Sequence, residues 1–203
     1  MSSLNNIGKK ARDSKMYCTS RHIMASLQKR ALVTKQKFAS PLDFDNSYQA
    51  YWSENTRDTV FGASTNAFDT NFRGFSFCHP IYCDYLLHSL VGHAYQSTNS
   101  RSTQEATATF LLLPDWLGWN KNGYMTWIND YPEHACVLAK FSADSMLLNP
   151  TEVWLDSPTQ PQHNKYKVQL IVVWNNQGKQ ALIESNPAWL NNLKQNSWSN
   201  VDF

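Results

Sequence analysis

The sequence predicts an α/β fold in which helices flank a mostly parallel sheet. Two predominantly apolar runs, at 106–113 and 168–174, have the composition of strands that are buried on both faces. Around them, leucine and valine recur at intervals of three and four residues, as they do on the buried face of a helix. Strands and helices that alternate along a chain are typical of a parallel sheet covered by helices.

The N-terminal half begins with a basic, polar segment at 1–17 that we expect to be disordered. After it, Ile23, Leu27 and Ala31 lie four residues apart, which predicts an amphipathic helix that packs on the fold. The elements expected in this half are a helix at 20–32, a short segment at 37–42 broken by Pro41, a helix with an aromatic face at 47–55, a loop at 58–73 and a strand at 74–78.

The C-terminal half contains the two strongest strand patterns. We treat residues 18–203 as one domain, because a chain of 203 residues is long enough for one sizeable core. The elements expected in this half are a helix at 83–96, a strand at 106–113, a short helix at 121–130, weaker strands at 134–143 and 153–155, a strand at 168–174, a turn at 175–178 and a short closing helix at 186–195.

Charge is distributed unevenly along the chain. Residues 1–39 hold nine Lys and Arg against one acidic residue, a net charge of +8, whereas 40–203 hold nine against fifteen, a net charge of −6. A basic arm suggests contact with the phosphate backbone of nucleic acid. A transit peptide and a solvated tail are the other interpretations of the first 17 residues. The candidate RNA-binding residues are Lys9, Lys10, Arg12, Lys15, Arg21, Lys29 and Arg30.

Composition argues against several classes of protein. No apolar run reaches the roughly 20 residues that span a bilayer, and no apolar segment typical of a secretory signal follows the basic start. The four cysteines show no CxxC pair and the six histidines lack metal-ligand spacing, so we expect reduced thiols and no metal site. The sequence therefore favours an intracellular protein of the nucleus or cytoplasm, with an organelle as the alternative.

Five segments, in this order and spacing, together resemble one family. They are KFASPLDF at 37–44, VFGAS at 60–64, GFSFCHPIYCDYLLHSLVGH at 74–93, FLLLPDW at 110–116 and KVQLIVVW at 167–174. The set resembles the phosphorylated-CTD-interacting-factor family, whose members methylate the cap-adjacent adenosine of messenger RNA at its exocyclic amine. The resemblance implies a Rossmann-like fold of the kind found in S-adenosylmethionine-dependent methyltransferases, without the family's WW module and most of its helical domain.

The resemblance assigns the substrate side of the site to the turn at 79–82. In the family, an Asn-Pro-Pro-Phe motif stands at this position, where the Asn oxygen and the first proline carbonyl accept the N–H groups of adenine and the aromatic ring stacks on the base. Here Pro80 keeps the carbonyl and Tyr82 keeps the ring, whereas Ile81 replaces the second proline. His79 replaces Asn, and an imidazole can accept a single hydrogen bond and only when neutral. The candidate catalytic residues are thus His79, Pro80 and Tyr82.

The resemblance also implies a pocket for S-adenosylmethionine, bordered by Phe38, Ser40, Pro41, Leu42 and Gly62. A packing turn that ends a strand at Pro41 is the competing interpretation of the first four of these residues. Because His79 and Ile81 depart from the family motif, we expect a divergent methyltransferase-like protein with impaired catalysis. Its expected role is that of an RNA-binding or scaffold subunit of a larger complex; an active adenine N6-methyltransferase on RNA is the alternative.

Overall fold

The computed structural model describes residues 17–19, 21–41, 44, 46–80, 82–100, 105–115, 123–141, 148–150 and 167–187. Within these ranges the helices are α2 (Arg21–Ala31), α3 (Asp84–Asn99), α4 (Met125–Asp130) and α5 (Asn176–Ser185), with short 3-10 helices η1 (Thr56–Phe61) and η2 (Ala67–Asp69). The strands are β1 (Tyr17–Thr19), β2 (Lys35–Lys37), β3 (Ala50–Ser53), β4 (Ser64–Thr65), β5 (Phe75–Cys78), β6 (Ala108–Pro114), β7 (Ala135–Phe141), β8 (Leu148–Pro150) and β9 (Val168–Trp174).

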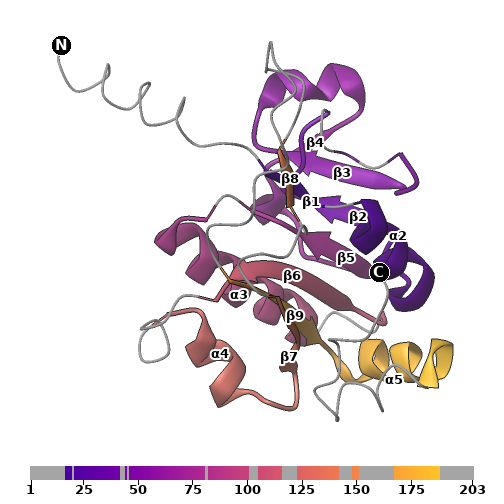
Figure 1. Cartoon of the computed structure of the whole chain (residues 1–203), viewed down its shortest axis with the longest axis vertical. Coiled ribbons are helices and arrows are strands. Elements are labelled where there is room, and N and C mark those ends of the chain that lie inside the picture. The colour runs from indigo at the N-terminus through magenta and orange to yellow at the C-terminus, as the bar shows by residue number, and fades with distance from the viewer. Residues whose placement is uncertain are drawn as a thin grey trace, which may run out of the picture.

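Seven strands form one mixed sheet in the order β4-β3-β2-β5-β6-β9-β7. Figure 1 shows them following one another from β4 near the top to β7 near the bottom. The neighbours from β4 to β6 are parallel, and β9 runs antiparallel to both β6 and β7. Strands β1 and β8 pair with each other in a separate two-stranded ribbon. The fold is therefore the expected α/β class with a mostly parallel sheet.

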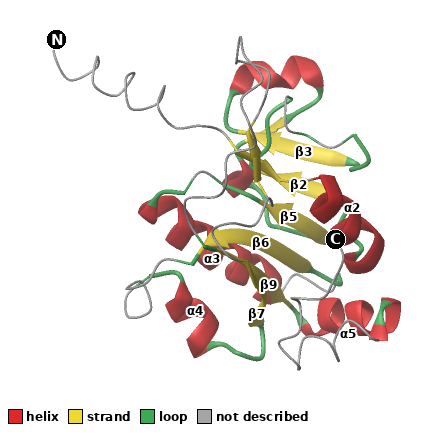
Figure 2. Cartoon of the chain, in the orientation of Figure 1, coloured by secondary structure: helices red, strands yellow, loops and turns green. Residues whose placement is uncertain are grey.

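Helices cover both faces of this sheet (Figure 2). All seven side chains of β6 and all seven of β9 are buried, and alternate residues point to opposite faces. On one face Phe110 and Leu112 pack with α2 and with Leu182 of α5. On the other face Leu111 and Leu113 pack with α3 and α4. The core thus consists of two apolar layers that the sheet separates.

Most of the expected elements are confirmed. The structure contains the helices expected near 20–32, 83–96 and 121–130 and the strands expected near 74–78, 106–113, 134–143 and 168–174. The segment at 58–73, expected as a loop, includes the two 3-10 helices and the short β4. Residues 1–16, the strand expected at 153–155 and most of the helix expected at 186–195 lie outside the described residues.

Two expectations were wrong. The segment at 47–55 is not a helix, because Ala50–Ser53 form β3 between β2 and β4, with Tyr51 and Trp52 directed to different apolar clusters. Pairing on both sides overrides the helical spacing of the aromatic residues. The second error is the turn expected at 175–178, which is the beginning of α5: the Asn175 side chain accepts a hydrogen bond from the Gly178 N–H and caps the helix.

Candidate functional site

The candidate site lies where the strand order reverses. From β2 the chain proceeds through β3 and β4 on one side of the sheet, and then returns to β5 and β6 on the other side. In open α/β sheets, ligands bind outside the carboxyl ends of the strands at such a topological switch point. The last residue of β2, Lys37, is paired with the last residue of β5, Cys78. Phe38 and His79 therefore leave the sheet side by side.

The segment that follows β2 turns sharply toward β3. Phe38 has a φ of +57°, a conformation uncommon for a bulky residue, and the next amide, Ala39 N–H, donates to the Trp52 carbonyl at 2.8 Å. The ring of Phe38 meets that of Phe68 edge-on at 5.3 Å. Ser40 is partly buried, and its carbonyl accepts from the Phe44 N–H. Strained backbone of this kind is common where a chain borders a ligand.

His79 is partly buried at the end of β5 and is held by the ribbon of β1 and β8. Its Nδ1 atom lies 3.0 Å from the Thr19 hydroxyl oxygen. Burial lowers the pKa of His79 to about 4, so the imidazole is neutral near pH 7. A neutral imidazole has one donor and one acceptor nitrogen. If Thr19 accepts from Nδ1–H, the Nε2 atom is an acceptor, and in the opposite tautomer it is a donor.

Tyr82 belongs to the core as much as to the site. Its ring contacts both apolar clusters and meets the His79 imidazole edge-on at 5.6 Å. Burial raises the pKa of its hydroxyl, and the nearby Tyr124 raises it further. Pro80 is buried between the two residues in sequence, and Ile81 lies outside the described residues. The structure thus brings His79 and Tyr82 together, with the tyrosine engaged in packing.

The cofactor-side residues converge through a small apolar cluster of Ala39, Tyr51 and Ala63, to which Phe44 is added. This cluster brings the segment after β2 next to the end of η1. Gly62 ends η1 with a φ of +87°, which favours glycine, and a Cβ at this position would meet open space. Pro41 is partly buried beside Ser40, whereas Leu42 and Asp43 lie outside the described residues.

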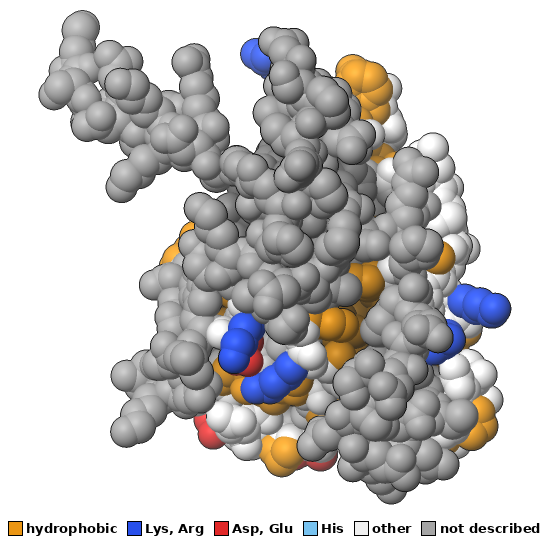
Figure 3. Space-filling view, viewed as in Figure 1, with side chains coloured by type: hydrophobic (Ala, Val, Ile, Leu, Met, Phe, Trp, Pro, Cys, Tyr) orange, Lys and Arg blue, Asp and Glu red, His pale blue; other side chains and the backbone are white. Residues whose placement is uncertain are grey.

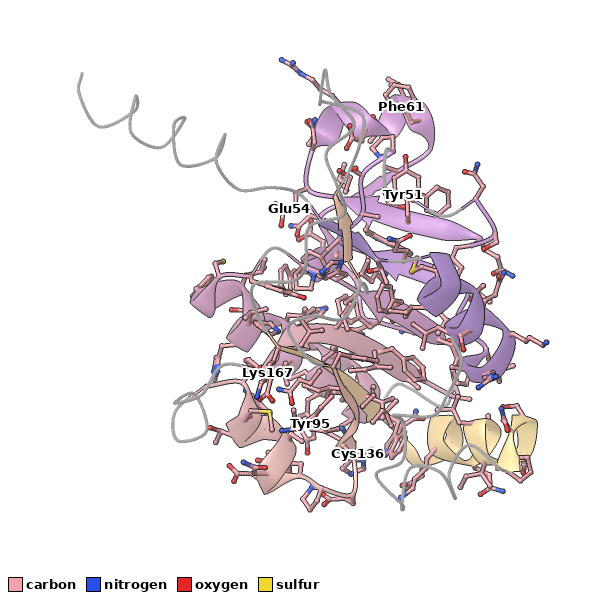
Figure 4. All side chains as sticks on the ribbon, viewed as in Figure 1. Tyr51, Glu54, Phe61, Tyr95, Cys136 and Lys167 are labelled. Carbon is pink, nitrogen blue, oxygen red and sulfur yellow. The ribbon has the colours of Figure 1, made fainter. Side chains whose placement is uncertain are left out.

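One acidic residue at this edge was missed by the sequence reasoning. Glu54 directly follows β3 and is exposed, and Figure 4 shows it at the same edge of the sheet to which β2 and β5 run. An acid at the end of the second strand, about 20 residues after the first, binds ribose hydroxyls in dinucleotide-binding folds. The signal was available in the sequence, but the helix expected at 47–55 concealed the strand end.

A buried polar network lies behind Tyr82 at the carboxyl end of β6. The Tyr124 hydroxyl donates to the Pro114 carbonyl and accepts from Gln169 Nε2 at 2.9 Å. Burial raises the pKa of Tyr124 to about 12, although the hydrogen bond from Gln169 opposes this effect. The network fixes the end of β6 next to the switch point. The sequence pattern did not predict this network, because its residues lie far apart along the chain.

The candidate RNA-binding residues are not all at this edge. Lys29 and Arg30 lie in the last turn of α2, just before β2 begins, so they are at the amino edge of the sheet, far from His79. Arg21 begins the same helix two residues after Thr19, close to the site. Figure 3 shows the described basic side chains scattered over this face rather than gathered in one patch. Lys9, Lys10, Arg12 and Lys15 lie outside the described residues.

The described structure has neither a membrane-spanning helix nor a metal-binding cluster, and the chain matches no known family model. Within the described ranges, no helix is long and apolar enough to cross a membrane, and no group of three or more His, Cys, Asp or Glu side chains is placed to hold a metal ion. No known family model matches the chain, and no curated protein matches it significantly. The sequence segments and the geometry of the site are therefore the only indications of function.

Proposed function

We propose that this chain is a divergent methyltransferase-like protein that binds S-adenosylmethionine at the switch point of its sheet and acts as an RNA-binding or scaffold subunit, with impaired catalysis. One observation carries the proposal. The two segments that resemble the adenosine methyltransferase family, at 38–41 and 79–82, follow paired strands and meet at the edge where α/β sheets bind ligands.

The residues at this edge fit a nucleoside cofactor that carries an amino acid. Glu54 offers a carboxylate for ribose hydroxyls. Phe38 and Trp52, both partly exposed, offer aromatic surface for a purine ring. The chain departs from dinucleotide-binding folds in one respect, because no glycine occurs between 38 and 49. When bound, the cofactor supplies the methyl group, and the chain's own contribution is to hold an acceptor amine against it.

The surroundings of His79 and Tyr82 support impaired catalysis. A methylase must accept the N–H groups of adenine and hold its ring in place. One imidazole nitrogen of His79 already faces the Thr19 hydroxyl, so at most one remains for a base. The Tyr82 ring packs into both layers of the core, which removes surface that a base would stack on.

Active adenine N6-methylation is a second candidate, and one observation favours it. Because burial lowers the pKa of His79 to about 4, the side chain is neutral throughout the physiological range. When the hydrogen of the neutral imidazole is on Nδ1, the Nε2 atom can accept one hydrogen bond from the amine, in place of the Asn oxygen of the family motif. In that case methyl transfer would persist at pH 5.5 and would fade only as the pH approaches 4.

Calorimetry with S-adenosylhomocysteine, followed by methyl transfer to capped and uncapped adenosine-containing RNA, separates these candidates. Binding without transfer supports the proposed function, and binding with transfer that His79→Ala abolishes supports the active enzyme. Glu54→Gln is expected to weaken binding about tenfold by removing a charged hydrogen bond. If no cofactor binds, both candidates fail.

The RNA component has its own test. Neutralising Arg21 and the four basic residues at 9–15 should reduce RNA affinity and its dependence on salt, because each lysine or arginine that neutralises a phosphate adds to the salt slope. Lys29→Gln with Arg30→Gln is the control at the opposite edge of the sheet; because it removes two charges rather than five, the losses are compared per charge removed. Equal losses per charge from both variants would indicate non-specific attraction rather than an RNA-binding edge.

A further inference from the structure

Lys37 is the most unusual charged residue of the described chain. It ends β2, beside Cys78 of β5, and it is only 2% exposed. Its neighbours are apolar or aromatic: the Nζ atom lies 2.9 Å from the centre of the Trp52 ring and 5.1 Å from that of Phe72. A lysine is almost never buried to this extent unless it is paired.

The aromatic rings compensate for only part of the burial. Cation–π contact stabilises a desolvated ammonium group by less than the removal of a charge from water costs. The two ion pairs in the described part of the chain, His134–Glu133 and Lys140–Asp115, do not involve this lysine. Burial lowers the pKa of Lys37 to about 7, so its charge changes within the neutral pH range.

The position of Lys37 is consistent with a role in ligand binding. The residue directly precedes Phe38, its strand partner directly precedes His79, and Trp52 lies two residues before Glu54. Lys37 therefore stands at the carboxyl end of β2, directly before one segment that borders the proposed cofactor pocket and paired with the strand that leads to the other. A buried cation without a carboxylate, at the ligand-binding edge of a sheet, is suited to an anionic group that the ligand brings.

We propose that Lys37 is an anion-binding residue that forms an ion pair with the carboxylate of the ligand's amino-acid part. This inference rests on the proposed function, because that function supplies a ligand with such a carboxylate. The Trp52 ring holds the ammonium group in place in the free protein, and the carboxylate becomes its partner in the complex. Lys37 thus selects ligands that carry an α-carboxylate over nucleosides that lack one.

Among Lys37 and the groups that face it, Lys37 is the residue whose charge should set the pH dependence of ligand binding. Cys78, on the neighbouring strand, is a neutral thiol because burial raises its pKa, and Trp52 and Phe72 do not ionise. Lys35, at the other end of β2, disfavours the charged form of Lys37. His93 packs on Phe72 at 4.6 Å. Because the carboxylate binds the charged form, affinity should fall as the pH rises above about 7.

The test compares two ligands by calorimetry: S-adenosylhomocysteine and its decarboxylated form, which lacks only the carboxylate. We expect the unaltered protein to prefer the first by about 10- to 100-fold, the effect of one hydrogen bond to a charged group. In Lys37→Met this preference should disappear, with affinity for the decarboxylated ligand unchanged or higher. Between pH 6 and pH 9, the preference should decline in the unaltered protein and stay absent in the variant.

Lys35→Met is the matched control, because it removes the same charge from the same strand at its other end, where Lys35 donates to the Arg73 carbonyl. It should keep the preference. A preference that survives Lys37→Met, or that Lys35→Met abolishes equally, would overturn the role of Lys37 and leave the proposed function intact. If the unaltered protein binds neither ligand, the proposed function and this inference fail together. Thermal unfolding of the variants identifies any loss of fold.

Discussion

His79 combines partial burial with a hydrogen bond to a distant strand, and its burial changes how it ionises. The pKa of the folded state is about 4, below the ordinary value of 6.5. Between these values the unfolded chain binds a proton that the folded protein does not. The free energy of unfolding should therefore fall as the pH drops from 6.5 to 4, by up to about 1.4 kcal/mol for each pH unit. His79→Gln should reduce this loss in urea titrations at several pH values.

The Thr19 hydroxyl should hold the His79 ring in place in either tautomer, because a hydroxyl can donate to Nδ1 or accept from it. Thr19→Val keeps the shape of the side chain but leaves Nδ1 without its 3.0 Å partner, so we expect a loss of about 1 kcal/mol in stability. Urea unfolding measures this loss. Thr19→Ser, which keeps the hydroxyl, should retain most of the stability. Equal stability of all three proteins would contradict a positioning role.

Lys37 should be a residue at which stability and binding conflict. Its folded pKa, about 7, is below its ordinary value of 10.5, so the unfolded chain holds the extra proton between these values and stability should rise with pH across that range. Lys37→Met should unfold at a higher temperature than the unaltered protein at pH 6 and should lose the pH dependence. A variant less stable at pH 6 would show that the ammonium group stabilises the fold.

At the scale of single elements, the beginning of α5 depends on a close backbone contact. A Cβ built on Gly178 would lie 2.1 Å from the Thr107 carbonyl oxygen. The Asn175 side chain accepts a hydrogen bond from the Thr107 N–H and donates one to the Glu105 carbonyl. Gly178→Ala should therefore destabilise the protein by about 1–3 kcal/mol, as overpacking does. Gln177→Ala, an exposed neighbour, is the control for thermal unfolding. A similar small effect from both changes would contradict the contact.

The strength of each sequence pattern determined which elements were predictable. β6 and β9 are buried along their whole length, so their apolar sequences predicted strands clearly. β3 has four residues, and only its pairing with β2 and β4 makes it a strand. In the site, the segments after β2 and β5 were recognisable because they are local. The Thr19 contact with His79 joins residues 60 positions apart and left no pattern in the sequence.

At the scale of the whole molecule, the sheet separates two apolar layers, and few side chains reach both. Tyr82 is one of them: it packs against the cluster beneath α2 and α5 and against the cluster beneath α3 and α4. A residue with this position connects the candidate site to the stability of the entire domain. The family resemblance assigns the same ring to base stacking, so packing and substrate binding compete for one side chain.

Truncation of Tyr82 tests which role dominates. If the ring is chiefly a core residue, Tyr82→Ala should lower the free energy of unfolding by about 3 kcal/mol, the low end for aromatic truncation in a core. Tyr82→Phe should keep most of the packing, and Tyr85→Ala, which removes a tyrosine that is 84% exposed three residues later, should leave stability unchanged. Urea unfolding measures all three. A Tyr82→Ala protein of unaltered stability that no longer binds RNA would instead place the ring in an open substrate pocket and favour the active enzyme.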